Sequence, residues 1–140
     1  MKLVIIDGQG GKMGRTVIEQ LKKNLPDLEI YAIGTNSIAT SAMLKAGADY
    51  GATGENPVIV VARTADIIIG PIGIVIANAL MGEITPSMAT AIGQSPAYKI
   101  LIPVNRCNHY IPGCGDHNLG EYIKMVCEET EKEVKKRENR

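Results

Sequence analysis

The residues best placed to do chemistry form a glycine-rich turn near the start of the chain. Gly8, Gly11 and Gly14 are spaced three apart, and Gly10 adds a further glycine between them. The turn follows the apolar run of residues 3–6 and leads into a segment with helical periodicity. Because glycine has no Cβ, its backbone N–H groups can approach an anion at the positive end of a new helix. The turn therefore predicts a diphosphate-binding site.

This motif departs from the strict G-x-G-x-x-G pattern, because Met13 stands at the third glycine position. A tight strand-to-helix connection without a ligand explains the same glycines and stays open as an alternative. If the turn does hold phosphate, we expect Gly11→Val to abolish binding and to leave the fold largely intact. The ligand-binding residues predicted in this turn are Gly8, Gln9, Gly10, Gly11, Lys12, Met13 and Gly14.

Asp7 stands directly before the turn, where a carboxylate repels a diphosphate unless a cation bridges the two or the side chain turns away. A contact to magnesium is one interpretation of this residue. An Asp before a glycine more often accepts hydrogen bonds from the next backbone amides, and we favour that role.

Composition limits the possible partners. The chain has 140 residues, which fits one domain, and its 15 basic and 15 acidic residues give a net charge of zero. A neutral chain has no general attraction to nucleic acid or to a membrane surface, so neither partner is expected. The apolar run of residues 3–6 is too short for a signal peptide, and no segment is long enough to span a membrane. We expect a cytoplasmic protein.

Short β-branched runs alternate with helical patterns along the whole chain. We expect strands at residues 2–7, 29–33, 48–50, 65–69 and 99–103. We expect helices at residues 14–24, 37–46, 57–63, 72–81 and 86–94, and from 118 to the charged end. Residues 57–63 would suit a strand equally well. This alternation predicts a single three-layer α/β, Rossmann-like domain of about five parallel strands in the order 3-2-1-4-5.

Further loops should meet the glycine turn at the carboxyl edge of this sheet, where open α/β folds bind ligands. The loop after the second strand lacks the carboxylate that usually binds a ribose, although its hydroxyl and amide groups could donate to a 2′-phosphate. The same side chains could instead cap the following helix. The additional binding residues predicted in these loops are Thr35, Asn36, Ser37, Gly70, Pro71, Gly73 and Asn105.

Three resemblances to known families accompany these patterns. The turn at residues 8–14 resembles the nucleotide-binding turn of dihydrodipicolinate reductases, which use NAD(P). Residues 65–73 and 99–105 are similar to two strands and loops of the gluconeogenesis-factor and 2-phospho-lactate transferase family, which implies a phosphorylated nucleotide ligand. From end to end, the chain resembles a family of short, uncharacterised, Rossmann-like bacterial proteins that share the motifs at residues 34–40 and 51–56.

The sequence thus predicts a protein that binds a nucleotide or dinucleotide, with NAD(P) favoured as the small-molecule ligand. The alternatives are a regulatory module that binds a nucleotide-diphosphate sugar without catalysis, and a small transferase. Catalytic residues are not assigned, and the patterns leave open whether the protein is an enzyme.

Both histidines and two of the three cysteines lie in one short segment, at Cys107, His109, Cys114 and His117. These are plausible zinc ligands, but their spacing lacks the paired short knuckles of structural zinc sites. We predict an ordinary loop without metal. A chelator should leave the thermal midpoint unchanged, and the purified protein should hold well under one zinc ion per chain. A full complement of zinc, with loss of stability on chelation, would contradict this prediction.

The segment of residues 72–81 is apolar nearly all round, with Asn78 as its polar residue. A helix of this kind would pack one face on the sheet and another on a second subunit. We therefore predict a homodimer. Light scattering at micromolar concentration should give twice the monomer mass, and a monomer would count against the prediction.

Overall fold

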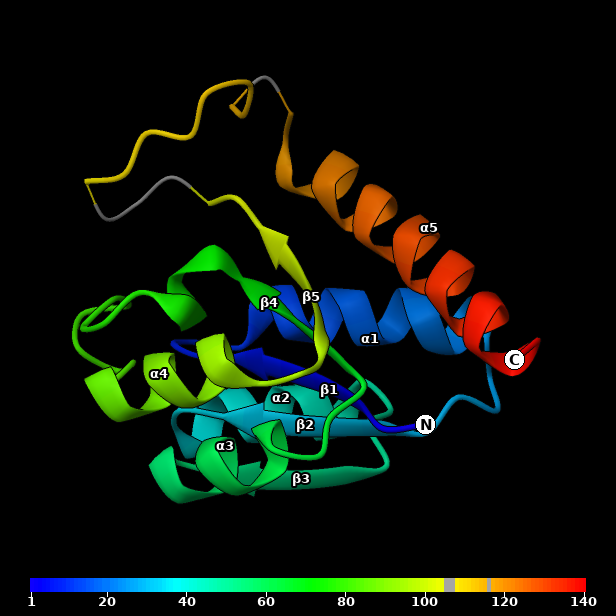
Figure 1. Ribbon diagram of the computed structural model, residues 1–140, viewed down its shortest axis with the longest axis horizontal. Coiled ribbons are helices and arrows are strands. Elements are labelled where there is room, and N and C mark those ends of the chain that lie inside the picture. Colours follow the sequence, from blue (N-terminus) through cyan, green and yellow to red (C-terminus); the bar gives the residue numbers. More distant parts are fainter. Residues whose placement is uncertain (105–107, 116) are drawn as a thin grey trace.

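The computed structural model describes residues 1–104, 108–115 and 117–140 (Figure 1). Within these residues a five-stranded parallel sheet has the strand order β3-β2-β1-β4-β5. The predicted Rossmann-like α/β class and strand order are thereby confirmed. The strands are β1 (Leu3–Asp7), β2 (Ile30–Gly34), β3 (Tyr50–Thr53), β4 (Ile67–Pro71) and β5 (Tyr98–Ile102). The helices are α1 (Lys12–Asn24), α2 (Ser37–Lys45), α3 (Glu55–Ala62), α4 (Pro86–Gln94) and α5 (Leu119–Glu138), with a 3-10 turn η1 (Ile72–Val75).

Strand β1 is the centre of the sheet, and each of its five residues is buried. It pairs with β2 on one side and with β4 on the other, so that Ile5 lies between Ala32 and Ile69. A parallel strand covered on both faces needs apolar side chains in both directions, which explains the uninterrupted run of residues 3–6.

Alternate residues of β1 enter two separate cores. Leu3 and Ile5 pack with the buried faces of α1, α2 and α5, whereas Val4 and Ile6 pack with α3, α4 and the segment after β4. Figure 1 shows α1 and α5 on one side of the sheet and α3 beside α4 on the other. The loop after each strand therefore leads towards one face of the sheet or the other. The direction of these loops decides where a ligand can enter.

Side-chain caps fix three helix starts. The oxygen of Asn36 accepts from the Ala39 amide at 2.9 Å, and Thr85 accepts from the Met88 amide at 3.1 Å. Asn118 caps α5 in the same way. A cap of this kind contributes about 1 kcal/mol to a helix. The predicted helix at residues 86–94 has these bounds in the structure. Of the predicted segment 57–63, residues 57–62 lie in a helix rather than a strand, and Arg63 is its C-cap.

The predicted helix at residues 72–81 is wrong. The segment is helical over η1 alone and then turns repeatedly, with left-handed backbone at Asn78 (φ 65°), Leu80 (φ 56°) and Met81 (φ 57°). Its apolar residues are buried by irregular chain, because Ile74 and the later Ala79 both reach the core beside α4. The homodimer was predicted from this helix, which the structure does not contain. The homodimer stays a prediction.

Two smaller observations concern single elements. Strand β3 lies later than the predicted residues 48–50, and it is a largely exposed edge strand whose sequence carries a weak pattern.

Cys127 lies on the buried face of α5 as predicted, and burial raises the pKa of its thiol to about 11, as expected for an inert core thiol. No helix among the described residues is long and apolar enough to cross a membrane.

Gly70 offers a test of how closely the central strands pack. A Cβ at this position would overlap the carbonyl oxygen of Ile6 in the neighbouring strand. We expect Gly70→Ala to lower the free energy of unfolding by about 1–3 kcal/mol, the usual cost of overpacking a core. Gly93, in α4, has open space around its Cβ position, so Gly93→Ala should be neutral or slightly stabilising. Urea unfolding of both variants checks the difference, and equal stability would contradict the packing argument.

Candidate functional site

The candidate site lies where the loops after β1 and β4 separate. These strands are neighbours in the sheet, but β1 leads into α1 on one face and β4 leads into η1 and α4 on the other. Divergence of two adjacent loops at the carboxyl edge opens a crevice at the switch point of the strand order. A cavity of about 480 Å³ is found there.

The glycine turn forms one wall of this cavity, and the loop after β4 forms another. Of the predicted residues, Gly8 to Met13 line the cavity together with Pro71 and Gly73. Apolar side chains form much of the remaining wall, and His109 adds a titratable ring. The lining residues that the sequence did not single out as ligand-binding are Asp7, Ile72, Ile76, Leu80, Met81, Val104, His109 and Leu119.

Asp7 holds the glycine turn against the start of α1. One carboxylate oxygen accepts from the Gly8 amide at 2.8 Å, and the other accepts from the Gly14 amide at 2.7 Å. The side chain is 6% exposed, and this burial raises its pKa above the ordinary value even though the two amides act in the opposite direction. The role of Asp7 as a residue that bonds the next backbone amides is therefore confirmed.

This arrangement leaves part of the turn available to a ligand. Gly11 is the N-cap residue of α1 and has no side chain that could cap the helix. Asp7 takes this role, because it accepts from the amide of Gly14, the third residue of the helix. Within the described residues, the amides of Gly10 and Lys12 donate to no protein acceptor. These two N–H groups, together with the exposed Lys12 ammonium, form the positive part of the cavity wall.

Gly11 is a structural glycine, which revises the expectation that Gly11→Val leaves the fold intact. Its φ is +71°, and a Cβ there would lie 2.8 Å from the Cα of Ala39 in α2. Gly10 differs, because its Cβ position is free of neighbouring atoms. A side chain added at Gly10, which lines the cavity, is therefore compatible with the fold of the turn.

Glu83 brings a second carboxylate to the glycine turn. Its Oε1 accepts from the Thr35 hydroxyl at 2.6 Å and from the Asn36 amide group at 2.7 Å. The Gln9 backbone N–H donates to both oxygens, at 3.0 and 3.2 Å. Partial burial raises the pKa of Glu83, but the hydrogen bonds from Thr35, Gln9 and Asn36 together hold it below its ordinary value. The carboxylate is thus ionised at neutral pH.

The remaining predicted residues have structural roles or lie beside the cavity. Thr35 and Asn36 follow β2 and bind Glu83, and Asn36 also caps α2. Ser37 is the exposed first residue of α2. Gly14 and Gly70 serve close packing of the backbone and do not line the cavity. Asn105 falls outside the described residues.

Sequence reasoning missed Glu83, because no local pattern connects it with Thr35, which lies 48 residues earlier. The contact depends on the irregular turns of residues 76–84, which the periodicity of that segment does not reveal. A left-handed turn signal was available in Asn78 and Gly82.

The segment with the Cys and His residues is described in part. Cys107 lies outside the described residues, among which no group of three His, Cys, Asp or Glu side chains could hold a metal. Nδ1 of His117 lies 2.8 Å from a carboxylate oxygen of Glu121, and the Tyr122 hydroxyl accepts from the Gly115 amide at 2.9 Å. The absence of structural zinc stays a prediction.

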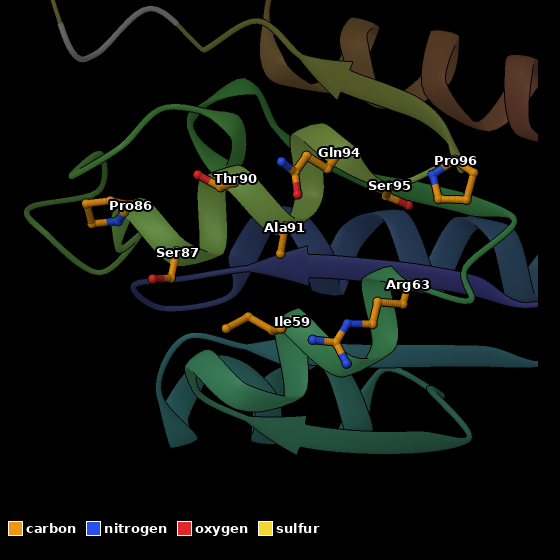
Figure 2. A pocket seen from close by; sticks show the side chains of 9 residues that line it. All are labelled: Ile59, Arg63, Pro86, Ser87, Thr90, Ala91, Gln94, Ser95 and Pro96. Atoms are coloured by element: carbon orange, nitrogen blue, oxygen red, sulfur yellow. The ribbon is translucent and has the colours of Figure 1, made fainter.

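A second hollow, of about 540 Å³, lies between α3 and α4. Figure 2 shows Ile59 of α3 and Arg63, which follows this helix, on one side of it and Ala91 of α4 on the other. It is an open groove along two helices and lies away from the divergent loops of β1 and β4. Its one charged lining residue is Arg63. The crevice at the glycine turn is the better candidate.

The hydrogen bonds to Glu83 predict how this carboxyl titrates. Thr35→Val keeps the side-chain shape and removes the hydroxyl donor, so the pKa of Glu83 should rise. A lowered pKa stabilises the fold above the unfolded value, and this contribution is lost as pH falls through the folded pKa. The variant should therefore be less stable than wild type at neutral pH, and this difference in stability should be smaller in acid. Carboxyl-carbon NMR titration, with Ser37→Ala as control, measures the shift; an unchanged Glu83 pKa would contradict the assignment.

Comparison with known proteins places the whole domain in one family. Neither the curated proteins nor the solved structures gave a match. Residues 2–135 match the family described as "Domain of unknown function (DUF3842)". The match covers every strand and nearly all of α5, and it confirms the resemblance to an uncharacterised family of short Rossmann-like proteins. The chain is a member of the DUF3842 family.

Proposed function

We propose that this protein binds a nucleotide or dinucleotide, with NAD(P) favoured, in the cavity between the loops after β1 and β4. The observation that carries the proposal is the position of the cavity. It lies at the switch point of a 3-2-1-4-5 sheet, with the glycine turn as one wall. Ligands of open α/β sheets bind in this crevice because two neighbouring loops diverge there.

The polar wall suits a diphosphate. The N–H groups of Gly10 and Lys12 and the Lys12 ammonium are donors grouped at the start of α1. Such donors attract an anion, and the helix dipole adds to the attraction. Asp7 lines the same cavity, but burial raises its pKa, which favours the neutral carboxyl and weakens its repulsion of an anion.

The apolar part of the wall suits an apolar ring. Ile76, Leu80, Val104 and Leu119 line the cavity, together with the 96% exposed Met81. A flat heteroaromatic base would cover these side chains and remove them from water, which contributes about 25 cal/mol for each Å² buried. A cavity that combines a small polar wall with a larger apolar one is the usual form of a cofactor site.

The proposal assigns binding and no reaction. Among the described lining residues, Asp7, Lys12 and His109 are the titratable groups. Asp7 is engaged with two amides, so a proton transfer to a ligand would have to use Lys12 or His109. Mass spectrometry of a denatured extract identifies the ligand that copurifies with the protein, and incubation with that ligand then separates binding from turnover.

Gly10 provides the direct test of the binding site. A Val side chain at this position has room in the fold, and because Gly10 lines the cavity we expect it to take up space that the ligand needs. We expect Gly10→Val to weaken binding of NAD and NADP at least about tenfold, equivalent to about 1.4 kcal/mol. Titration calorimetry measures both affinities.

Gly93→Val is the matched control, since Gly93 also has open space around its Cβ position but lies far along α4. Both variants should keep the wild-type circular dichroism spectrum, and Gly93→Val should bind as wild type does. The same affinity in wild type and Gly10→Val would show that the ligand does not enter this cavity.

A further inference from the structure

Glu83 is a charged group held beside the cavity by neutral donors. Thr35, Asn36 and the Gln9 backbone supply its hydrogen bonds, and no Lys or Arg side chain among the described residues forms an ion pair with it. Neutral donors fix the position of a carboxylate without cancelling its charge. The negative charge therefore remains available to a ligand.

The chain fixes this position from both sides of Glu83. The Glu83 amide donates to the Leu80 carbonyl at 3.1 Å, and the next residue, Ile84, is fully buried. The Asn78 amide donates to the Ile84 carbonyl at 2.7 Å, which closes the turn. Left-handed backbone at Leu80 and Met81 is costly for residues with side chains, so the surrounding packing must hold the turn in this form.

Glu83 does not itself line the cavity; its carboxylate lies next to Gly8 and Gln9, which do, on the side of the loop after β2. A Cβ on Gly8, which lines the cavity, would be 3.2 Å from Oε1 of Glu83. Oε1 already accepts three hydrogen bonds, whereas Oε2 accepts one, from the Gln9 amide, among the described residues. Oε2 can thus accept a further hydrogen bond, from a hydroxyl group of a ligand.

We propose that Glu83 accepts the ribose hydroxyls of the bound nucleotide and makes the site select a free 2′-hydroxyl over a 2′-phosphate. This inference rests on the proposed function and names its ligand more closely, as NAD in preference to NADP. The carboxylate stands between the loops after β1 and β2, next to the glycine turn, and attracts hydroxyl donors while repelling a phosphate.

The same contacts engage two of the three donors that the sequence predicted for a 2′-phosphate. Thr35 donates its hydroxyl hydrogen to Glu83, and the Asn36 amide group donates to Glu83 and to the Gln9 carbonyl, whereas Ser37 is exposed at the start of α2. A 2′-phosphate would have to displace an ionised carboxylate from these groups and remain beside it. Selection therefore comes from an attractive contact to the diol and a repulsive one to the phosphate.

The experiment compares NAD and NADP binding to wild type and to Glu83→Gln by titration calorimetry. Glutamine keeps an acceptor oxygen and removes the charge. We expect wild type to prefer NAD at least about tenfold, in line with a hydrogen bond to a charged group. In Glu83→Gln the preference should fall to about threefold or less, through weaker NAD binding and stronger NADP binding.

Two further variants separate this role from a general effect on the fold. Glu55 is a carboxylate that also accepts from a threonine hydroxyl, at 2.8 Å from Thr85, but it lies on α3, whereas Glu83 accepts from the glycine turn. Glu55→Gln should keep the full preference for NAD. Thr35→Val loosens the carboxylate without removing its charge, and it should reduce the preference less than Glu83→Gln does.

The outcomes distinguish the two proposals. If Gly10→Val weakens both cofactors and Glu83→Gln leaves their ratio unchanged, the binding site stands and the role of Glu83 is wrong. Stronger binding of both cofactors by Glu83→Gln overturns the role as well, because the carboxylate would then block the site. If wild type binds neither cofactor, NAD(P) is excluded as the ligand of the proposed function, and the selection by Glu83 is wrong as well.

Discussion

The hydrogen bonds from the Gly8 and Gly14 amides to Asp7 are the constraint on which the site depends. They join the last residue of β1 to the first turn of α1, so strand, turn and helix form one rigid unit. A carboxylate that caps a helix from the preceding strand satisfies the helix N-terminus internally. Among the described residues, the amides of Gly10 and Lys12 keep no protein acceptor, and the proposed phosphate would lie against these two groups. Glycine at 14 permits the close contact with Met43 of α2 that locks the unit to its neighbour.

Much of the fold could be predicted because its elements carry strong, short-range signals. The run of residues 3–6 is apolar on both faces, as a central parallel strand requires, and Thr85-Pro86 combines a capping hydroxyl with a proline in the first turn. The glycine turn and the loop after β4 were expected at one edge, since parallel strands all end there. Edge strand β3 was placed too early, because an exposed strand shows little alternation.

The segment between β4 and α4 could not be predicted, and the most informative residue of the site lies there. Apolar residues at Ile74, Ala79 and Ile84 are each separated by five positions and are all buried, which a regular helix cannot achieve on one face. Composition does not distinguish a buried helix from a buried series of turns, because both are apolar. Left-handed backbone at Asn78, Leu80 and Met81 directs the chain back towards β2, and Glu83 reaches the glycine turn through this reversal. The contacts of Glu83 depend on tertiary packing, so they cannot be predicted from the local sequence.

The two carboxylates at the turn, Asp7 and Glu83, have pKa values that are shifted in opposite directions. Burial raises the pKa of Asp7, so its contribution to stability is present in acid and declines as pH rises through the folded pKa. Glu83 behaves in the opposite way, because hydrogen bonds outweigh its partial burial and lower its pKa. The charge of Glu83 also adds to the rise in the pKa of Asp7, which couples the two groups. Asp7 thus shapes the turn from within, while Glu83 holds the turn to the loop after β2 from outside. The proposed ligand would place its negative charge near Lys12 and its hydroxyl groups near Glu83.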